Sequence, residues 1–357
     1  MGMIKKIHRY KLLFVMLLGI GLSGICLAQT PHAVIVKDMA GREIRVKAQV
    51  EKVVGIEAGA LRILVYLDAA PRVVGVEDTE KKELTKPYLM AHPELAKLPS
   101  IGPIHGGDAE LIMAQKPDVI FWTSATAGNA DALQQKTGIP VVVLNYGDLD
   151  NQKSIFYQAL RITAKVLHKQ ARAEKLIGYI EAQIKNLDGR TQKAPQNQTV
   201  YVGGVSFRGA HGMTSTEPDY APFRYVNAKN AAAGIGLEHI FIEKEKLIQW
   251  NPDKIFIDTG GYQLVLNDLA AGSTLAQSLQ AVKNGQLYTV LPYNWYTTNF
   301  ETVLANAFYI GKVLYPAQFQ DVTPETKADE IYKMFVGKGV YGEMKKMYGG
   351  FQKVERK

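Results

Sequence analysis

The sequence predicts an α/β protein with two lobes, each a mainly parallel sheet covered by helices, joined by a single long inter-lobe α-helix. Short apolar runs typical of buried strands alternate with helical segments in both halves of the chain. A unit of helix, Pro-Asp turn and strand occurs twice, and its two copies align without a gap. The copies are ELIMAQKPDVIFWT at residues 110–123 and EKLIQWNPDKIFID at residues 245–258. Between the halves lies an amphipathic helix with no predicted strand near it in the sequence.

Residues 1–28 have the pattern of a signal peptide. Four basic residues precede an apolar run at 12–22, which is too short to span a bilayer comfortably. The sequence Cys26-Leu27-Ala28 then offers a small-x-Ala site for cleavage before Gln29. Ile25 stands where a lipoprotein signal has a small residue, so we expect export without a lipid anchor on Cys26.

The composition of the remaining chain excludes several classes of protein. Removing the four basic residues of the signal from the formal charge of +8 leaves +4, and no basic block occurs, so nucleic acid is not an expected partner. Cys26 is the only cysteine, so the mature chain can form no disulfide, thiolate metal site or cysteine nucleophile. Removing 28 of the 357 residues leaves 329, enough for two lobes with separate cores.

The first lobe is expected over residues 29–150. A hairpin with a glycine-containing turn at residues 38–41 opens it. Strands and helices then alternate, with strands at 52–56, 72–76, 118–122 and 140–144 and helices at 58–67, 110–115 and 130–136.

A helical region follows at residues 151–190 and contains the inter-lobe helix. Its apolar residues recur every three or four positions from Ala173 to Leu187, which indicates one buried stripe. A helix over 171–188 would be about 27 Å long at 1.5 Å per residue. The polar, proline-containing segment 191–197 then has the composition of a linker.

The second lobe and the C-terminal helices are expected over residues 191–357. A strand at 199–205 leads into a long loop at 206–223 that is rich in glycine, proline and serine. After the repeated unit, the pattern predicts a helix at 274–283, a strand at 286–290, a loop at 292–296 and helices at 301–314 and 329–335.

The repeated unit separates into a structural part and an unexplained part. Pro117 and Pro252 disfavour helical geometry in the residue before them, so each helix stops there and the following apolar strand enters a sheet. The fold alone does not require Glu110 and Glu245, near the start of each helix, to be acidic. A solvated surface glutamate is the alternative interpretation of both.

Residues at the carboxyl ends of the strands are the candidates for ligand binding, because open parallel sheets bind ligands there. Aromatic rings supply apolar contact area, and arginine offers a planar fork to carboxylate, catecholate or phosphate oxygens. Such a mixture suits an anionic, partly flat ligand. Trp122 could equally belong to the core, and Arg208 could form a surface ion pair. The candidates are Glu57, Trp122, Thr123, Arg208, His211, Trp295 and Tyr296.

Three enzyme or metal-carrier classes fit the sequence poorly. The segment 204–208 lacks the second glycine of a hydrolase nucleophile elbow. Gly234-Ile235-Gly236 has no strand before it and His239 in place of the third glycine of a dinucleotide motif. The histidines are scattered, against a carrier of bare zinc or manganese ions.

Several motifs, in this order and spacing, resemble the periplasmic binding proteins of iron–siderophore, haem and cobalamin importers. The resemblance covers nearly the whole mature chain. It rests on the hairpin 36–44 running into 51–55, on segments 72–76, 116–120 and 251–255, and on the helical region 159–187, which is similar to that family's inter-lobe backbone helix.

The resemblance implies a periplasmic, monomeric solute-binding protein of an ABC importer that is not an enzyme and has no cofactor of its own. It places the ligand between the lobes and implies only a small closing motion. In that family, a helix-borne glutamate seven residues before the proline of each turn meets arginines on the membrane permease, which works with an ATPase. Glu110 and Glu245 occupy those positions.

The expected ligand is a metal chelate. Arg208 and His211 favour an anionic complex such as a ferric siderophore over neutral cobalamin. A haem or cobalamin carrier of the same fold remains an alternative, as does a periplasmic sensor that uses this fold without transport.

Overall fold

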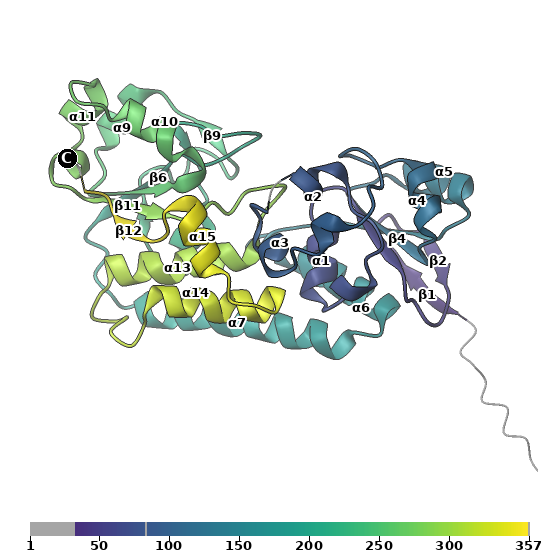
Figure 1. Ribbon diagram of the computed structural model, residues 1–357. Coiled ribbons are helices and arrows are strands. Elements are labelled where there is room, and N and C mark those ends of the chain that lie inside the picture. The colour runs from purple at the N-terminus through teal and green to yellow at the C-terminus, as the bar shows by residue number, and fades with distance from the viewer. Residues whose placement is uncertain (1–32, 83, 356–357) are drawn as a thin grey trace, which may run out of the picture.

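The computed structural model describes residues 33–82 and 84–355. The predicted signal peptide, with Cys26, lies outside the described residues. Figure 1 shows two lobes side by side, with helix α7 (Gln170–Thr191) running beneath both of them. The predicted α/β fold class, with parallel sheets flanked by helices, is confirmed.

The first lobe is built on a parallel sheet of three strands in the order β3-β4-β5. Every residue of β3 and β5 is buried, as expected for parallel strands covered on both faces. The sheet strands are β3 (Val53–Ile56), β4 (Val119–Thr123) and β5 (Val141–Leu144), and the hairpin strands are β1 (Val34–Lys37) and β2 (Glu43–Val46). The helices are α1 (Ala60–Tyr66), α2 (Asp78–Lys82), α3 (Pro87–Ala91), α4 (Ala109–Gln115) and α5 (Ala127–Thr137), with 3₁₀ turns η1 (Ala70–Arg72) and η2 (Leu95–Lys97).

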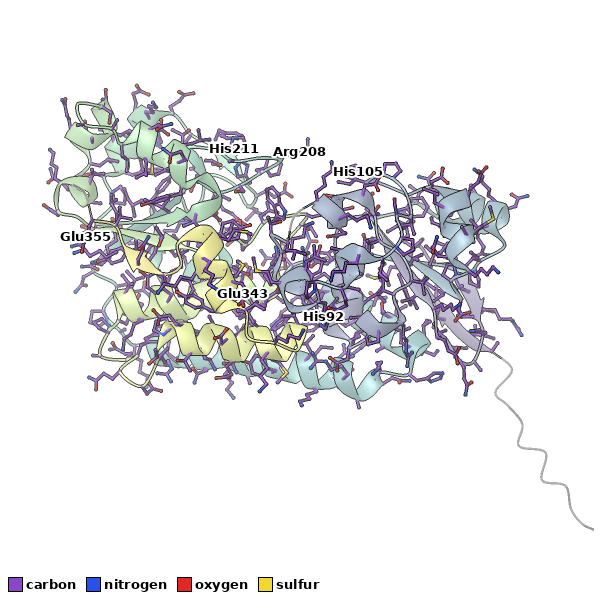
Figure 2. The ribbon with its side chains drawn as sticks, in the orientation of Figure 1. His92, His105, Arg208, His211, Glu343 and Glu355 are labelled. Atoms are coloured by element: carbon purple, nitrogen blue, oxygen red, sulfur yellow. The ribbon has the colours of Figure 1, made fainter. Side chains whose placement is uncertain are left out.

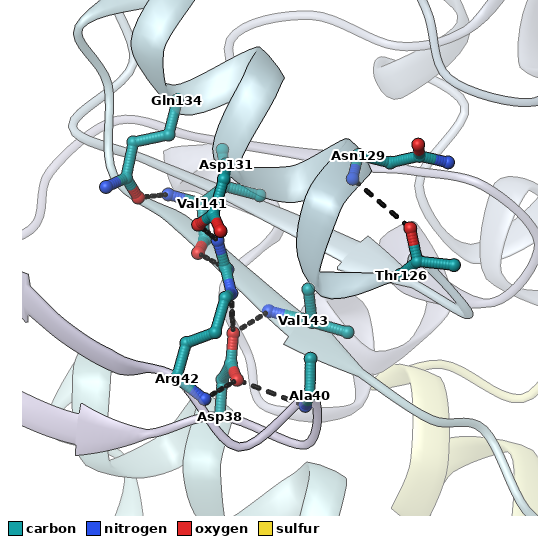
Figure 3. A network of polar contacts seen from close by, with 9 residues as sticks. All are labelled: Asp38, Ala40, Arg42, Thr126, Asn129, Asp131, Gln134, Val141 and Val143. Carbon is teal, nitrogen blue, oxygen red and sulfur yellow. Dashed lines mark hydrogen bonds and ion pairs between the residues drawn. The ribbon is translucent and has the colours of Figure 1, made fainter.

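The turn of the β1–β2 hairpin is fastened to the edge of this sheet (Figure 3). The buried Asp38 carboxylate accepts hydrogen bonds from the backbone N–H groups of Ala40, at 3.0 Å, and of Val143 in β5, at 3.1 Å. Arg42 pairs with Asp38 and also reaches Asp131 of α5, at 2.7 Å in both cases. Because a buried carboxylate needs partners, this network fixes the hairpin on the sheet.

The strand predicted at residues 72–76 is not formed. Val73 makes one isolated parallel bridge with Val53, and Val76 makes another with Ser100. The 3₁₀ turn η1, which contains Pro71, ends at Arg72, so only a single residue joins β3 before the chain turns towards Ser100.

The helical region consists of two helices, α6 (Lys153–Leu167) and α7, and not of one continuous helix. His168, in left-handed conformation with φ +56°, ends α6. The buried side of α7 carries the predicted apolar stripe, including Ala173, Leu176 and Ile180.

The second lobe contains a sheet of five strands in the order β12-β11-β10-β6-β8, parallel except for the short edge strand β12. The strands are β6 (Thr199–Gly203), β8 (Lys229–Asn230), β10 (Lys254–Asp258), β11 (Leu287–Val290) and β12 (Gln352–Lys353), with a separate pair β7 (Ser215–Thr216) and β9 (Ile240–Phe241). Short helices surround them: α8 (Ala221–Tyr225), α9 (Lys244–Trp250), η3 (Thr259–Gly261), α10 (Tyr262–Asp268), α11 (Thr274–Ser278) and α12 (Gln280–Lys283). The helix predicted at 274–283 is therefore divided at Leu279, whose extended backbone separates α11 from α12.

The lobes are joined by packing as well as by the chain. The C-terminal helices α13 (Phe300–Leu314), α14 (Pro324–Val336) and α15 (Tyr341–Tyr348) lie between α7 and the second sheet in Figure 1. Phe156 of α6 packs on Phe300 with ring centroids 4.1 Å apart, and Tyr66 of α1 packs on Phe335 at 5.1 Å. One apolar cluster therefore runs from the first lobe into the second. Among the described residues, no helix is long and apolar enough to cross a membrane.

Candidate ligand cleft

A cleft of about 460 Å³ lies between the two lobes at the carboxyl ends of the strands. Figure 2 shows His105 of the first lobe and Arg208 of the second on the edges that face each other there. A second hollow of about 530 Å³, around Arg190 and Asp321, lies on α7 and away from the strand ends. The cleft is lined by Ala58, Thr79, Ile104, His105, Ser206, Phe207, Arg208, Gly209, Asn294, Trp295, Tyr296 and Thr297.

A chain of polar contacts crosses the cleft from one lobe to the other. Glu57 follows β3 with φ +73°, and its carboxylate lies 2.5 Å from Nδ1 of His105. The backbone N–H of Glu57 donates to Glu77 at 3.1 Å, and the other oxygen of Glu77 accepts from the Tyr296 hydroxyl at 2.7 Å. Burial raises the pKa of Glu77, although these hydrogen bonds oppose the change. Tyr296 is thereby fixed to the first lobe.

A buried ion pair supports the first-lobe wall from behind. Lys86 and Glu80 lie 2.8 Å apart, and both side chains are almost fully buried. The Tyr88 hydroxyl also donates to Glu80, at 2.7 Å. The two opposite charges offset each other inside the lobe, so we do not assign either of them to the ligand.

One part of the second-lobe wall is formed by residues 294–297, which belong to the segment 294–298 that we call the aromatic loop. Trp295 is 42% exposed, an unusual degree of exposure for so large a ring. Tyr296 and Thr297 both have left-handed backbones, with φ +51° and +63°. Asn294 donates to the carbonyl of Ser206 at 2.9 Å and so joins this loop to residues 206–209, the other part of the second-lobe wall.

The other part of the second-lobe wall, residues 206–209, contains Arg208, the one arginine among the described residues that line the cleft. Arg208 lies over the ring of Phe207, with 5.3 Å from the guanidinium carbon to the ring centroid, and makes no ion pair with any described residue. Phe207 in turn stacks on His239, with centroids 4.4 Å apart and planes 7° apart. The guanidinium can therefore meet an anion beside a flat apolar surface.

The predicted ligand residues fall into two groups. Arg208, Trp295 and Tyr296 line the cleft, and Glu57 reaches its edge through His105. The other three predicted residues are engaged elsewhere: Thr123 is buried and donates to the carbonyl of Ala58 at 2.9 Å, Trp122 packs against the apolar cluster of the first sheet, and His211 Nε2 lies 2.7 Å from the carbonyl of Phe207.

The sequence pattern did not single out His105 or Phe207. His105 lies in a loop that contains Gly102, Gly106 and Gly107 and ends at Asp108. Asp108 caps α4 by accepting from the backbone N–H groups of Glu110 and Leu111, at 2.9 Å each. The glycine-rich loop that ends in this helix cap is the sequence signal from which His105 could have been predicted as a cleft residue.

The two glutamates of the repeated unit have matching positions. Glu110 is the second residue of α4 and Glu245 is the second residue of α9, and both side chains are exposed. Within residues 33–82 and 84–355, neither carboxylate forms an ion pair. Figure 1 shows α4 and α9 in different lobes, both on the side opposite α7.

A sequence profile described as periplasmic binding protein matches residues 53–293. The molybdate-binding protein MolA of Haemophilus influenzae is 25% identical over 324 residues, which cover 84% of this chain and 90% of MolA. The matched profile segment begins at the first residue of β3 and ends directly before the aromatic loop.

Solved structures of such proteins share the fold. MolA bound to molybdate superposes with a TM-score of 0.67 at 24% identity, covering 85% of this chain and 98% of MolA. A periplasmic solute-binding protein from Veillonella parvula gives 0.71 at 19% identity, covering 88% and 96% of the two chains. The periplasmic haem-binding protein HutB of Vibrio cholerae gives 0.56 at 19% identity, covering 74% and 99%.

Proposed function

This chain belongs to the periplasmic binding protein family, and we propose that it captures an anionic metal chelate of the ferric siderophore type between its lobes. It delivers this ligand to the permease of an ABC importer, which is driven by an ATPase. The chain is exported by its predicted signal peptide and acts in the periplasm as a monomer that catalyses no reaction.

The observation that carries the ligand class is that the Arg208 guanidinium, which forms no ion pair with any described residue, lines the same cleft as the exposed ring of Trp295. Arginine donates to the oxygens of catecholates, hydroxamates and carboxylates, and the indole ring covers a flat organic ligand. A cleft of about 460 Å³ suits a small organic complex, since ligand pockets span roughly 300–1,000 Å³.

Molybdate is a second candidate, because MolA binds it and is 25% identical to this chain. A tetrahedral oxyanion of five atoms needs convergent N–H donors and gains little from aromatic rings. Phe207, Trp295 and Tyr296 therefore favour the chelate. Haem and cobalamin carriers of the same fold are the remaining candidates.

The test is a titration of the mature protein, followed by tryptophan fluorescence, with a ferric catecholate siderophore, a ferric hydroxamate siderophore, haem, cobalamin and molybdate. We expect saturable binding of a ferric siderophore. Tight binding of molybdate or cobalamin, with no response to either ferric siderophore, would overturn the proposed ligand class.

Arg208→Gln tests the role of the guanidinium. Losing one charge-assisted hydrogen bond should weaken binding of the anionic chelate about 10- to 100-fold. Arg224→Gln is the matched control, because Arg224 is a partly exposed arginine of the same lobe that pairs with Asp219 at 3.0 Å outside the cleft. Equal affinities of the two variants would contradict a role for Arg208.

We further propose that Glu110 and Glu245 form two docking points for the permease. Their exposure, the absence of an ion pair with any described residue and their positions in different lobes support this role. Two separated charges would orient the protein on its partner and raise the association rate more than the affinity. A sensor that used this fold without transport would not need this pair.

A further inference from the structure

The guanidinium of Arg62 lies between the lobes, outside the set of residues assigned to the ligand above. Arg62 belongs to α1 of the first lobe and is only 1% exposed. We propose that Arg62 is the positioning residue of the cleft: it holds the aromatic loop of the second lobe in the shape that presents Trp295 and Tyr296 to the ligand. The ligand in this proposal rests on the proposed function, whereas the role of Arg62 in shaping the loop rests on the observed contacts.

The contacts of Arg62 are concentrated on that loop. One terminal nitrogen donates to the carbonyl of Thr298 at 2.9 Å, and the other donates to those of Trp295 and Tyr296 at 3.0 and 3.1 Å. Three of the five carbonyls of the aromatic loop therefore accept from one side chain of the opposite lobe. A planar fork can reach several acceptors in this way, whereas a lysine ammonium cannot copy its geometry.

Tyr146 completes the arrangement from the first lobe. Its hydroxyl accepts from Arg62 at 2.6 Å and donates to the carbonyl of Thr298 at 2.8 Å. The tyrosine can approach this closely because Gly59 has no side chain: a Cβ there would lie 2.2 Å from the Tyr146 ring. The guanidinium also lies over the rings of Tyr88 and Tyr146, at 5.0 and 5.6 Å, so it is held on several sides.

The loop conformation requires such support. Tyr296 and Thr297 are consecutive left-handed residues, and neither is glycine. Left-handed backbone is unfavourable for L-residues with a side chain, most of all for a β-branched one such as Thr297, and it persists where the surrounding structure over-determines it. Arg62 donates to the carbonyl of Tyr296, the first residue of this strained pair, and to the carbonyl of Trp295, the residue before it.

Burying this charge opposes folding unless the charge has partners. No carboxylate of the described residues lies within ion-pair distance of Arg62, although the fully buried Glu301, which accepts from the Tyr66 hydroxyl, is close enough to favour the cation electrostatically. A pair of apolar residues would fill the same space without desolvating a cation. We infer that the arginine is present for the geometry it imposes on the loop across the lobe boundary.

The first experiment needs no ligand. Hydrogen exchange of the peptide containing residues 294–299 is followed by mass spectrometry in the ligand-free protein and in Arg62→Lys. We expect exchange at the aromatic loop to become at least about tenfold faster in the variant, because its carbonyl contacts loosen. Unchanged exchange there would overturn the proposal, whatever ligand the protein binds.

Arg172→Lys is the matched control. Arg172 also donates to three backbone carbonyls, those of Tyr66, Met334 and Phe335, and it too joins distant helices, but it does not touch the cleft. We expect similar thermal destabilisation in both lysine variants and faster exchange of the aromatic loop in Arg62→Lys alone. Equal exchange in the two variants would reduce Arg62 to a general structural role and overturn the proposal.

The second experiment measures binding of the ferric siderophore that wild type binds best. Arg62→Lys should lose about tenfold in affinity, and Arg172→Lys should bind as wild type does. If Arg62→Lys fails to fold, Tyr146→Phe removes the hydroxyl contact to Thr298 and is expected to show the same two effects more weakly. If wild type binds no chelate, the proposed function fails, and the hydrogen-exchange result still decides whether Arg62 positions the loop.

Discussion

The two copies of the helix, Pro-Asp turn and strand can be compared residue by residue. Lys116 ends α4 with φ +50°, and Asn251 ends α9 with φ +41°. Two residues later, Asp118 accepts from the N–H of Lys52, directly before β3, and Asp253 accepts from the N–H of Thr199, the first residue of β6. The turn therefore has the same structural role in both lobes, because the left-handed helix end and the hydrogen bond from a backbone N–H to the aspartate both recur.

The donors around the two aspartates differ. Asp118 accepts from the N–H groups of Glu51 and Lys52, at 2.8 Å each, and pairs with Lys47 at 2.6 Å. Among the described residues, the Asp253 carboxylate accepts only from Thr199, through its N–H at 2.7 Å and its hydroxyl at 3.0 Å. The backbone path of the unit is common, whereas each lobe supplies its own partners. The exposed glutamates in the first turn of each helix make no side-chain hydrogen bond or ion pair with any described residue.

The largest effect is expected from reversing both exposed glutamates. Glu110→Lys combined with Glu245→Lys should reduce ligand uptake by cells at least about tenfold, because like charges across an interface cost several kcal/mol. Ligand affinity of the purified protein should stay at the wild-type value. Uptake of the labelled ligand and fluorescence titration provide the two measurements.

The control reverses two other exposed glutamates, one in each lobe: Glu43 in β2 and Glu343 in α15. The same change in net charge at these positions should leave uptake intact. Normal uptake in the Glu110/Glu245 double variant would show that docking does not use this pair.

A smaller effect is expected from removing the aspartates of the turns. Asp118→Ala loses two backbone partners and an ion pair and should lower the free energy of unfolding by about 3 kcal/mol, whereas Asp253→Ala should lower it by about 2 kcal/mol. Denaturant unfolding measures both values. Asp131→Ala, at an exposed side chain that pairs with Arg42, should change it by less than about 1 kcal/mol. Equal losses at Asp118 and Asp253 would contradict the difference drawn between the lobes.

The Asp118 contribution should also depend on pH. Partial burial opposes ionisation, but the contacts from Lys47, Lys52 and Glu51 outweigh it and lower the pKa of Asp118. A lowered pKa in the folded state means that the stabilisation is complete above the unfolded value of about 3.9 and is lost as the pH falls through the folded pKa. The stability gap between wild type and Asp118→Ala should therefore close in acid below about pH 4. A gap that does not narrow as the pH falls below about 4 would exclude this cause.

The smallest effects are expected at the left-handed helix ends, and they should have opposite signs. Lys116→Gly relieves an unfavourable backbone and should stabilise the protein by about 0.5 kcal/mol. Asn251→Gly relieves less, since asparagine tolerates this conformation, and it loses the hydrogen bond from the Gln280 N–H to the Asn251 side chain, at 2.9 Å. Asn251→Gly should therefore destabilise by about 0.5 kcal/mol. Thermal unfolding of both variants checks the signs, and the same sign in both would contradict this interpretation.

Much of the fold was predictable from local pattern. The repeated unit, the opening hairpin and the long α7 all rest on periodicity, proline and glycine, which act over a few residues. The family predicted from the order of these motifs is also confirmed. The segment 72–76 misled because a run of valines indicates a strand, whereas pairing depends on where the chain is carried next, here to Ser100.

The cleft was less predictable, because it depends on contacts between residues far apart in the sequence. The rule of strand ends indicated Arg208 and the aromatic loop. It could not distinguish Thr123, which turns inward to Ala58, from a cleft residue. The contacts of Arg62 with residues more than 230 positions away have no local signal at all.

Helix α7 has a practical consequence for optical biosensors made from this protein. Arg172 near its start is bonded to the ends of α1 and α14, and Arg190 near its end forms a two-bond pair with Asp321, at 2.7 Å each. Because these bonds hold both ends of the connecting helix, we expect only a small closing motion, and we predict that a fluorophore pair placed across the two lobes reports little change in distance. We therefore expect a single environment-sensitive dye beside the aromatic loop to be the better reporter, because its signal would come from contact with the proposed ligand.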